Sequence, residues 1–387
     1  MASVLELVDG QEEAQLLLVE EAGSEGGIEI EDISGEDRIT SPFDPTLIRV
    51  EPRPLTIDLM MARLRENEID LAPDFQRKAG IWSNQAQSRL IESLLIRIPL
   101  PAFYVDATDD ERWVVVDGLQ RLTTLKRFIV DQSLKLTGLE FLPLDGKVYD
   151  ELPRNYQRRI LETQITVFAI TRGTPDEVKF TIFRRINTGG KPLSPQEIRH
   201  ALNQGKITKR LATLAKSPEF QRAVAWGVAD DRMEDRELVL RFLTFALIPP
   251  TEYKAQDFDG FLNRAMQQMN QMTDTELDEM ERNFKRAMKA ATALFDNDAF
   301  RKRYDARQRR KSINKPLFET WSVNLHRLGD DALEQLLQRK EEVRAAFIHL
   351  MNEDRLFDNS VSQGTGDVTK VQYRFARIGQ LLQEVLA

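Results

Sequence analysis

The sequence has no cysteine among its 387 residues. Disulfides, thiolate metal sites and cysteine nucleophiles are therefore excluded together, and we expect a cytoplasmic protein. Histidine is almost as scarce. Only His200, His326 and His349 are present, and no two of them have the close spacing of a zinc-binding pair. A nuclease built on histidine and a metal ion is not expected from this inventory.

Long apolar runs are also missing, since no stretch approaches the roughly 18 residues that cross a bilayer. The first residues lack a basic patch followed by an apolar core, so we expect neither a secretory signal nor a membrane partner. A Gly-x-x-x-x-Gly-Lys-Ser/Thr loop is absent, which excludes a P-loop enzyme. The 41% hydrophobic and 30% charged residues are typical of a globular protein, and the length allows two domains.

The net charge of −8 is unevenly distributed along the chain. Residues 1–50 contain thirteen acidic and two basic residues, a charge of −11, which leaves +3 for residues 51–387. Residues 1–45 are predicted to form a mostly disordered acidic leader. The leader is either a solubilising tail, the interpretation that we favour, or a segment that competes for the protein's own basic groove.

Residues 46–205 show alternating strand and helix signals, which predict an α+β domain. Thr56 is expected to cap a helix that runs through Arg65, and Ser83 or Asn84 to cap a second one. Strands are expected around residues 102–105, 113–116 and 164–170. Pro175 and Ser194 mark the starts of two further helices. Beyond residue 206 the strand signals vanish and the helical period dominates, so residues 206–387 are predicted to form an all-helical domain.

The strongest local signal is the strand ending at Asp117-Gly118 and running into the helix of Leu119-Gln120-Arg121. Backbone N–H groups at a helix start, together with the helix dipole, suit an anion such as a phosphate. Arg121, expected on the helix surface, could grip a phosphate at two oxygens, and Asp117 could hold Mg²⁺ against it. The alternative is an ordinary turn in which Asp117 caps the helix and Arg121 is paired on the surface.

The segment Val114–Leu125 resembles the Asp-Gly-Gln-Gln-Arg motif of the N-terminal domain of GmrSD-type modification-dependent restriction systems, a domain similar to the ParB/sulfiredoxin-like fold. Further resemblances follow in the family's order: Phe75-Gln76-Arg77 with Trp82, Ile98–Pro101, and Phe183–Gly190. The similarity covers about residues 55–205. Asn314–Glu319 and Arg374-Phe375 in the helical part also resemble the family.

The resemblance implies binding of a nucleoside triphosphate with Mg²⁺, and in several members hydrolysis, coupled to recognition of DNA. It assigns the catalytic role to Asp117, Gln120 and Arg121, with Asp117 as the metal ligand. The nucleotide-binding residues that it implies are Gln76, Arg77, Gly118, Thr123, Arg185, Asn187, Gly189 and Gly190. Leu119 stands where the family usually has Gln, so a polar contact is missing and hydrolysis is expected to be slow.

A second electrostatic feature is a run with seven basic residues in eleven, interrupted by Tyr304. Such a run can neutralise DNA phosphates, with the tyrosine available for stacking; the alternative is a solvated helix face or loop. The candidate DNA-binding residues are Arg301, Lys302, Arg303, Arg307, Arg309, Arg310 and Lys311.

Many relatives carry a His-Asn-His nuclease domain after the nucleotide domain, and the sequence has no such motif. We therefore expect a sensor or regulatory subunit of a phage-defence or restriction system, with DNA and a separately made nuclease as partners. The sequence leaves its oligomeric state open. Two alternatives remain. One is a non-enzymatic DNA-binding module that nucleotide only switches, and the other is an interaction scaffold with a vestigial motif.

Overall fold

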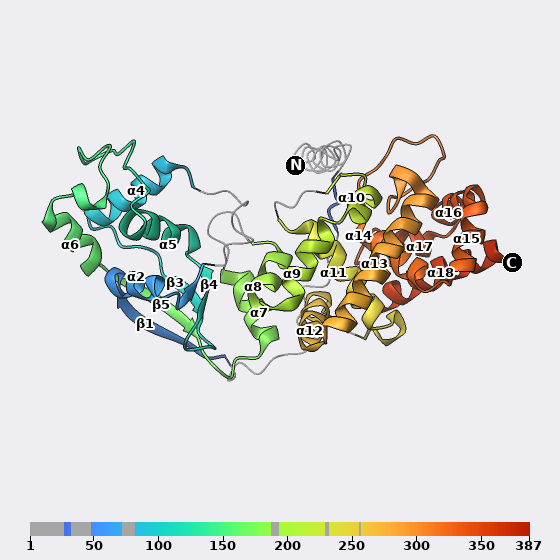
Figure 1. Ribbon diagram of the computed structural model, residues 1–387, viewed down its shortest axis with the longest axis horizontal. Helices are drawn as coiled ribbons and strands as arrows, with labels where there is room; N and C mark the ends of the chain where they lie inside the picture. Colours follow the sequence, from blue (N-terminus) through green and yellow to red (C-terminus); the bar gives the residue numbers. More distant parts are fainter. Residues whose placement is uncertain (1–26, 32–47, 72–81, 187–192, 229–231, 255–256) are drawn as a thin grey trace, which may run out of the picture. The chain divides into compact units, whose positions relative to one another are not determined.

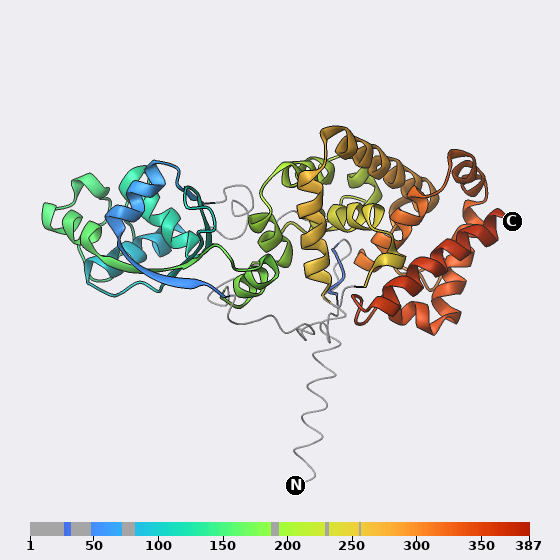
Figure 2. The same cartoon turned by 90° about the horizontal axis from the view of Figure 1, so that it is seen from below.

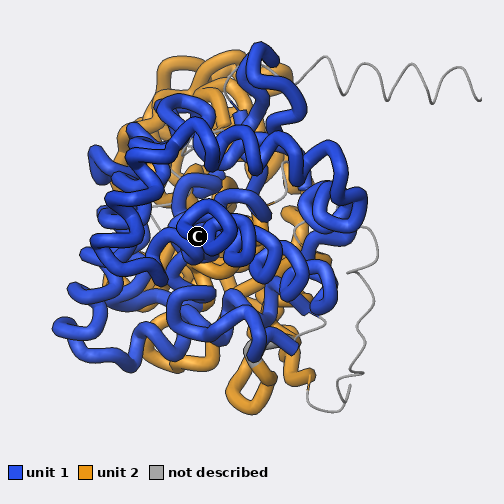
Figure 3. Tube along the Cα trace, turned by 90° about the vertical axis from the view of Figure 1, so that its right-hand side faces the viewer, with its two compact units in different colours: residues 1–41, 203–387 blue, residues 42–202 orange. Residues whose placement is uncertain are grey.

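The computed structural model describes residues 27–31, 48–71, 82–186, 193–228, 232–254 and 257–387. The chain divides into two compact units (Figure 3). One comprises Pro42–Leu202 and is called the α+β unit below; the other comprises Asn203–Ala387 together with Met1–Ser41 and is called the helical unit. The expected α+β class with a helical C-terminal part is confirmed, whereas the ParB/sulfiredoxin-like arrangement stays a prediction.

The α+β unit is built on a five-stranded mixed sheet with the strand order β1-β5-β3-β4-β2. Its strands are β1 (Val50–Thr56), β2 (Ile69–Asp70), β3 (Phe103–Asp106), β4 (Trp113–Asp117) and β5 (Gln164–Ile170). The pairs β5·β3 and β4·β2 are parallel, and β1·β5 and β3·β4 are antiparallel. β1 was not predicted, because Pro52 and Pro54 interrupt its strand signal. Both prolines are tolerated since β1 is an edge strand that pairs on one side only.

Three helices of the α+β unit begin at the capping residues that the sequence indicated. Thr56 accepts the N–H of Leu59 at the start of α2, and Ser83 accepts that of Ala86 at the start of α4. Ser194 accepts the N–H of Glu197, whose carboxylate in turn accepts that of Ser194, a reciprocal cap. The helices are α2 (Ile57–Arg65), α4 (Asn84–Leu95), α5 (Leu119–Leu125), α6 (Arg154–Glu162), α7 (Asp176–Ile186) and α8 (Pro195–Leu202), with a single 3₁₀ turn at Tyr149–Glu151 and a π-helical turn that extends α5 over Lys126–Val130.

Neighbouring residues of the strands belong to two apolar clusters on opposite faces of the sheet. Val115 and Ala169 belong to the larger cluster, together with residues of α2, α4, α5 and α6. Figure 1 shows α4, α5 and α6 on one side of the sheet. Their neighbours Val116 and Ile170 face the other way and pack with apolar residues of α7 and α8. The loop after β4 is thus fixed by packing on both faces.

The helical unit has one large apolar core, to which its helices contribute buried faces. The helices are α9 (Lys206–Ala215), α10 (Pro218–Ala223), α11 (Glu234–Leu247), α12 (Phe258–Gln271), α13 (Asp274–Phe295), α14 (Lys315–His326), α15 (Asp330–Gln338), α16 (Lys340–Glu353), α17 (Arg355–Ser360) and α18 (Val368–Leu386), with 3₁₀ turns at Pro250–Glu252 and Asp296–Asp298. Figure 2 shows the short blue segment 27–31 lying against yellow and orange helices of this unit. Within the described residues no helix combines the length and the apolar character that crossing a membrane requires.

Candidate functional site at the end of β4

The turn between β4 and α5 requires glycine at position 118 for two reasons. Gly118 has φ +96°, a left-handed conformation that side chains disfavour. A Cβ atom placed there would also lie 2.4 Å from the Phe103 ring. The predicted strand–Gly–helix junction is confirmed, but Gly118, not Asp117, is the residue that precedes the first helical turn.

Arg121 is buried rather than exposed, so its expected place on the helix surface was wrong. Its side chain retains 11% of its accessible surface, and Nη2 donates to Oδ2 of Asp117 at 2.9 Å. Nη1 donates to the carbonyls of Pro101 and Ala102, and the guanidinium lies 4.6 Å from the centre of the Phe103 ring. These carbonyls belong to the extended segment before β3, and the guanidinium supplies their hydrogen bonds. Burial lowers the pKa of Arg121, and the Asp117 carboxylate partly opposes that effect.

Gln120 connects two of the motif segments. Its Oε1 accepts the backbone N–H of Trp82 at 3.3 Å, so the tryptophan of the upstream box lies at the β4–α5 turn. Thr123 lies three residues further along α5, on the same face of the helix and partly accessible. Arg185 is exposed near the end of α7. Gln76, Arg77, Asn187, Gly189 and Gly190 lie outside the described residues.

Two further polar residues support this region and were not anticipated. Gln87 of α4, only 1% exposed, donates from Nε2 to the Trp82 carbonyl at 2.7 Å and accepts from Arg127 at 2.8 Å. Lys179 of α7 forms an ion pair of 3.2 Å with Asp106 of β3, and both side chains are largely buried. The sequence does not indicate that Gln87 supports the site, because its partners Trp82 and Arg127 are 5 and 40 residues away.

The donors and acceptors left for a ligand are few. Both terminal nitrogens of Arg121 are engaged by Asp117 and by backbone carbonyls, so a two-oxygen grip on phosphate would displace existing bonds. The Asp117 carboxylate keeps 27% of its side-chain surface accessible. Among the described residues, no group of three histidine or acidic side chains is arranged to hold a metal ion. Any Mg²⁺ here would depend on Asp117 and on oxygens of the nucleotide itself.

The basic run divides into an inward and an outward half. Arg301 is 1% exposed and donates to the carbonyls of Ala299 and Val224, and burial lowers its pKa to about 10. Lys302 pairs with Glu29 at 2.6 Å and Arg303 with Asp298 at 2.6 Å. These three are therefore not free surface cations, as the DNA-binding prediction had assumed. The accessible cations are Arg307, Arg309, Arg310 and Lys311.

Tyr304 is also less available for stacking than the sequence suggested. Its hydroxyl donates to Asp358 at 2.6 Å, and Lys311 lies 4.7 Å from the ring centre. Burial and the Asp358 carboxylate raise the pKa of Tyr304. The ring is half-buried, and a base that stacked on the face next to Lys311 would have to displace that side chain.

A comparison with protein families identifies the segment that contains the β4–α5 turn. Residues 61–204 match the model of the GmrSD restriction endonuclease N-terminal domain, from α2 through α8 of the α+β unit. No curated protein matches the chain. The matched range includes Trp82, the Asp117–Arg121 turn and Arg185, the segments that carried the resemblance. Residues 61–204 are therefore similar to the N-terminal domain of GmrSD restriction endonucleases.

Proposed function

We propose that the chain is a regulatory subunit of a restriction system, which binds a nucleoside triphosphate with Mg²⁺ beside the β4–α5 turn and acts with DNA and a separate nuclease. The family match supports the restriction-system role. The observation that carries the nucleotide site is the Asp117–Gly118–Arg121 turn, which is held by the Asp117–Arg121 ion pair and to which Gln120 hydrogen-bonds Trp82.

The buried Arg121 changes the roles that we propose within this site. Arg121 holds Asp117 and the chain before β3 in place, and so acts as a positioning residue. Direct phosphate contacts are assigned to Thr123 and Arg185, whose side chains are accessible, and to the first backbone N–H groups of α5. Asp117 would hold the magnesium ion, which neutralises phosphate charge when bound. Gln76, Arg77, Asn187, Gly189 and Gly190 complete the proposed nucleotide site.

Thermal melting of the purified chain with ATP, GTP, CTP or UTP, each with Mg²⁺, tests nucleotide binding. A ligand at 100 times its Kd stabilises the folded chain by about 2.7 kcal/mol, so one nucleotide should raise Tm selectively. Arg185→Ala should abolish that shift. Arg158→Ala is the matched control, because Arg158 is 68% exposed in the same unit and removes the same charge. No shift with any nucleotide at millimolar concentration would contradict the proposal.

Hydrolysis separates the enzyme from its main alternative. Turnover of the bound nucleotide, measured as released phosphate, is expected for a catalytic site that includes Asp117 and Gln120. Tight binding with release of intact nucleotide would instead establish a DNA-binding module that nucleotide only switches. The nuclease is assigned to another chain, so the purified protein should not nick DNA with nucleotide and Mg²⁺.

DNA binding is assigned to the outward half of the basic run. Changing Arg307, Arg309 and Arg310 to Gln should weaken binding to duplex DNA and reduce the slope of log K against log salt by up to about 0.9 per lost phosphate contact. The same change at three exposed lysines of the helical unit, Lys209, Lys216 and Lys289, is the control. Equal loss in both triple variants would assign the effect to overall charge rather than to this run.

A further inference from the structure

A short segment from the acidic N-terminal region, residues 27–31, is held against the helical unit by an isolated parallel β-bridge between Ile28 and Ile313, and is called the strand below. Glu29 N–H donates to the Ile313 carbonyl at 2.8 Å, and Ile313 N–H donates to the Gly27 carbonyl at 2.9 Å. Ile28 packs against the core of the helical unit, whereas Ile30 points away with 85% of its surface exposed. The helical unit therefore contacts alternate side chains of the strand: Ile28 is bound, and Ile30 is exposed to solvent.

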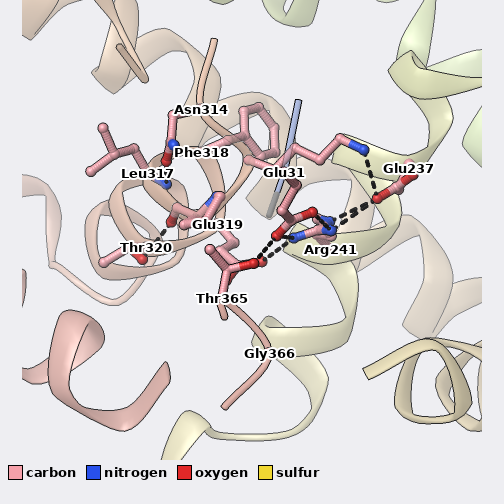
Figure 4. A network of polar contacts seen from close by, with 12 residues as sticks. Glu31, Glu237, Arg241, Asn314, Leu317, Phe318, Glu319, Thr320, Thr365 and Gly366 are labelled. Carbon is pink, nitrogen blue, oxygen red and sulfur yellow. Dashed lines mark hydrogen bonds and ion pairs between the residues drawn. The ribbon is translucent and has the colours of Figure 1, made fainter. Parts of the chain in front are cut away.

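Both glutamates of the strand are bound by side chains of the helical unit. Glu29 accepts from Lys302 at 2.6 Å and from Asn314 at 3.1 Å. The Glu31 carboxylate accepts hydrogen bonds from both terminal nitrogens of Arg241, at 2.5 and 3.2 Å, and from the Thr365 hydroxyl. Figure 4 shows the Glu31 carboxylate between Thr365 and Arg241. Its side chain is only 10% exposed.

Cations of the helical unit face the two glutamates of the strand. The cations of this ion-pair network are Arg241, Lys302, Lys315 and Arg374, and its carboxylates from the helical unit are Glu237 and Glu319. The strand adds two carboxylates to these pairs, with Glu29 at Lys302 and Glu31 at Arg241. The Arg241 and Glu319 side chains are 4% and 0% exposed, so an unbalanced charge here would be costly. The empty site would favour an acidic occupant.

Backbone pairing, one apolar contact and two bound carboxylates are the means by which protein surfaces recognise short extended peptides. We propose that the helical unit is a receptor for an acidic peptide with the pattern Ile-Glu-x-Glu, that Ile28–Glu31 fills this receptor in cis, and that the same motif on a partner protein can replace it. This inference does not depend on nucleotide binding, since its residues lie in the other unit.

A fluorescent peptide with the sequence of residues 24–34 tests the proposal by anisotropy. The receptor is the full chain carrying Glu29→Gln and Glu31→Gln, which weakens the cis strand with little change of shape. This variant should bind the peptide saturably and at least tenfold more tightly than the wild-type chain, because the tethered wild-type strand competes at a high effective concentration. If the double variant does not fold, Glu29→Gln alone gives the same comparison, because that carboxylate is 34% exposed.

Two peptide variants form a matched pair. Ile28→Ser should abolish binding, while Ile30→Ser should leave it unchanged, because only the first isoleucine packs against the core. Absence of saturable binding to a folded receptor variant would overturn the proposal. So would equal affinities of the two serine peptides. Displacement of the peptide by duplex DNA at equal charge concentration would also overturn it, since the site would then recognise polyanions in general.

Discussion

The Arg121 guanidinium joins three chain segments: the end of β4, the start of α5 and the Pro101–Ala102 carbonyls before β3. Only a planar group with several donors can make these contacts together. The structure therefore gives this motif arginine a role in shaping the turn. Any ligand bound at the turn depends on that role indirectly.

Arg121→Lys should destabilise the α+β unit while keeping the charge. Lysine can still reach Asp117 but cannot also supply both carbonyls, and lost hydrogen bonds to a charged group cost about 1.5–3 kcal/mol. Denaturant unfolding of the full chain measures the loss. Arg112→Lys is the control, because Arg112 is 62% exposed and makes one ion pair, with Asp70. Equal stability of the two variants would show that the Arg121 contacts contribute nothing.

Leu119→Gln should destabilise the chain rather than restore hydrolysis. Leu119 is 8% exposed and belongs to the larger core cluster of the α+β unit. A glutamine there would bury an amide without partners, at a cost of about 1–3 kcal/mol. A lower Tm with unchanged phosphate release is the expected result. Leu59→Gln, at a 45% exposed leucine of the same unit, should leave Tm nearly unchanged.

At the scale of elements, Glu92 anchors the loop after α5 to α4. Its carboxylate accepts the backbone N–H groups of Glu140, Phe141 and Leu142, at 2.7–2.9 Å, and is 3% exposed. Burial alone would raise the pKa of Glu92, but these three donors outweigh burial and lower it. Three consecutive backbone N–H groups, 48 to 50 residues further along the chain, thus bind one carboxylate of α4.

Protonation of Glu92 should destabilise the α+β unit in acid. Because the pKa of Glu92 is lower in the folded chain than the ordinary value of 4.5, its stabilisation is complete above that pH and is lost as the pH falls through the lowered pKa. Glu92→Gln should lower the unfolding free energy at pH 7 by about 1.5–3 kcal/mol and flatten its dependence on pH below 4.5. Glu140→Gln, at an exposed carboxylate, is the control.

The elements that could be predicted are those whose signals are local. Thr56, Ser83 and Ser194 cap helices through N–H groups three residues away, so the sequence indicates them directly. β1 could not be predicted, because its pairing with β5 more than 100 residues later overrides two prolines. Burial of Arg121 depends on carbonyls 19 and 20 residues away, and the positions of Arg301 and Lys302 depend on tertiary packing that a charge run does not reveal.

At the scale of the whole molecule, the bound strand should respond to pH. Burial would raise the pKa of Glu31, but Arg241 and Lys315 outweigh burial and Glu237, and Thr365 adds a hydrogen bond, so the pKa is lowered. Strand binding is therefore favoured above pH 4.5 and weakens as the pH falls through the lowered pKa. Hydrogen exchange at the Ile313 amide, corrected for intrinsic rates, should accelerate as the pH falls through the lowered pKa of Glu31. Glu31→Gln should show fast exchange at pH 7 already, and an unchanged rate would contradict this account.

The strand at residues 27–31 also determines how the chain is threaded. Along the chain, residues 27–31 pair with the helical unit, and the α+β unit follows. The chain re-enters the helical unit at Asn203. In sequence, the α+β unit is thus inserted between two parts of the helical unit rather than preceding that unit. A protein cut between residues 31 and 48 should consequently keep its N-terminal piece as a non-covalent fragment, which would elute with the remainder until acid or high salt separates the two.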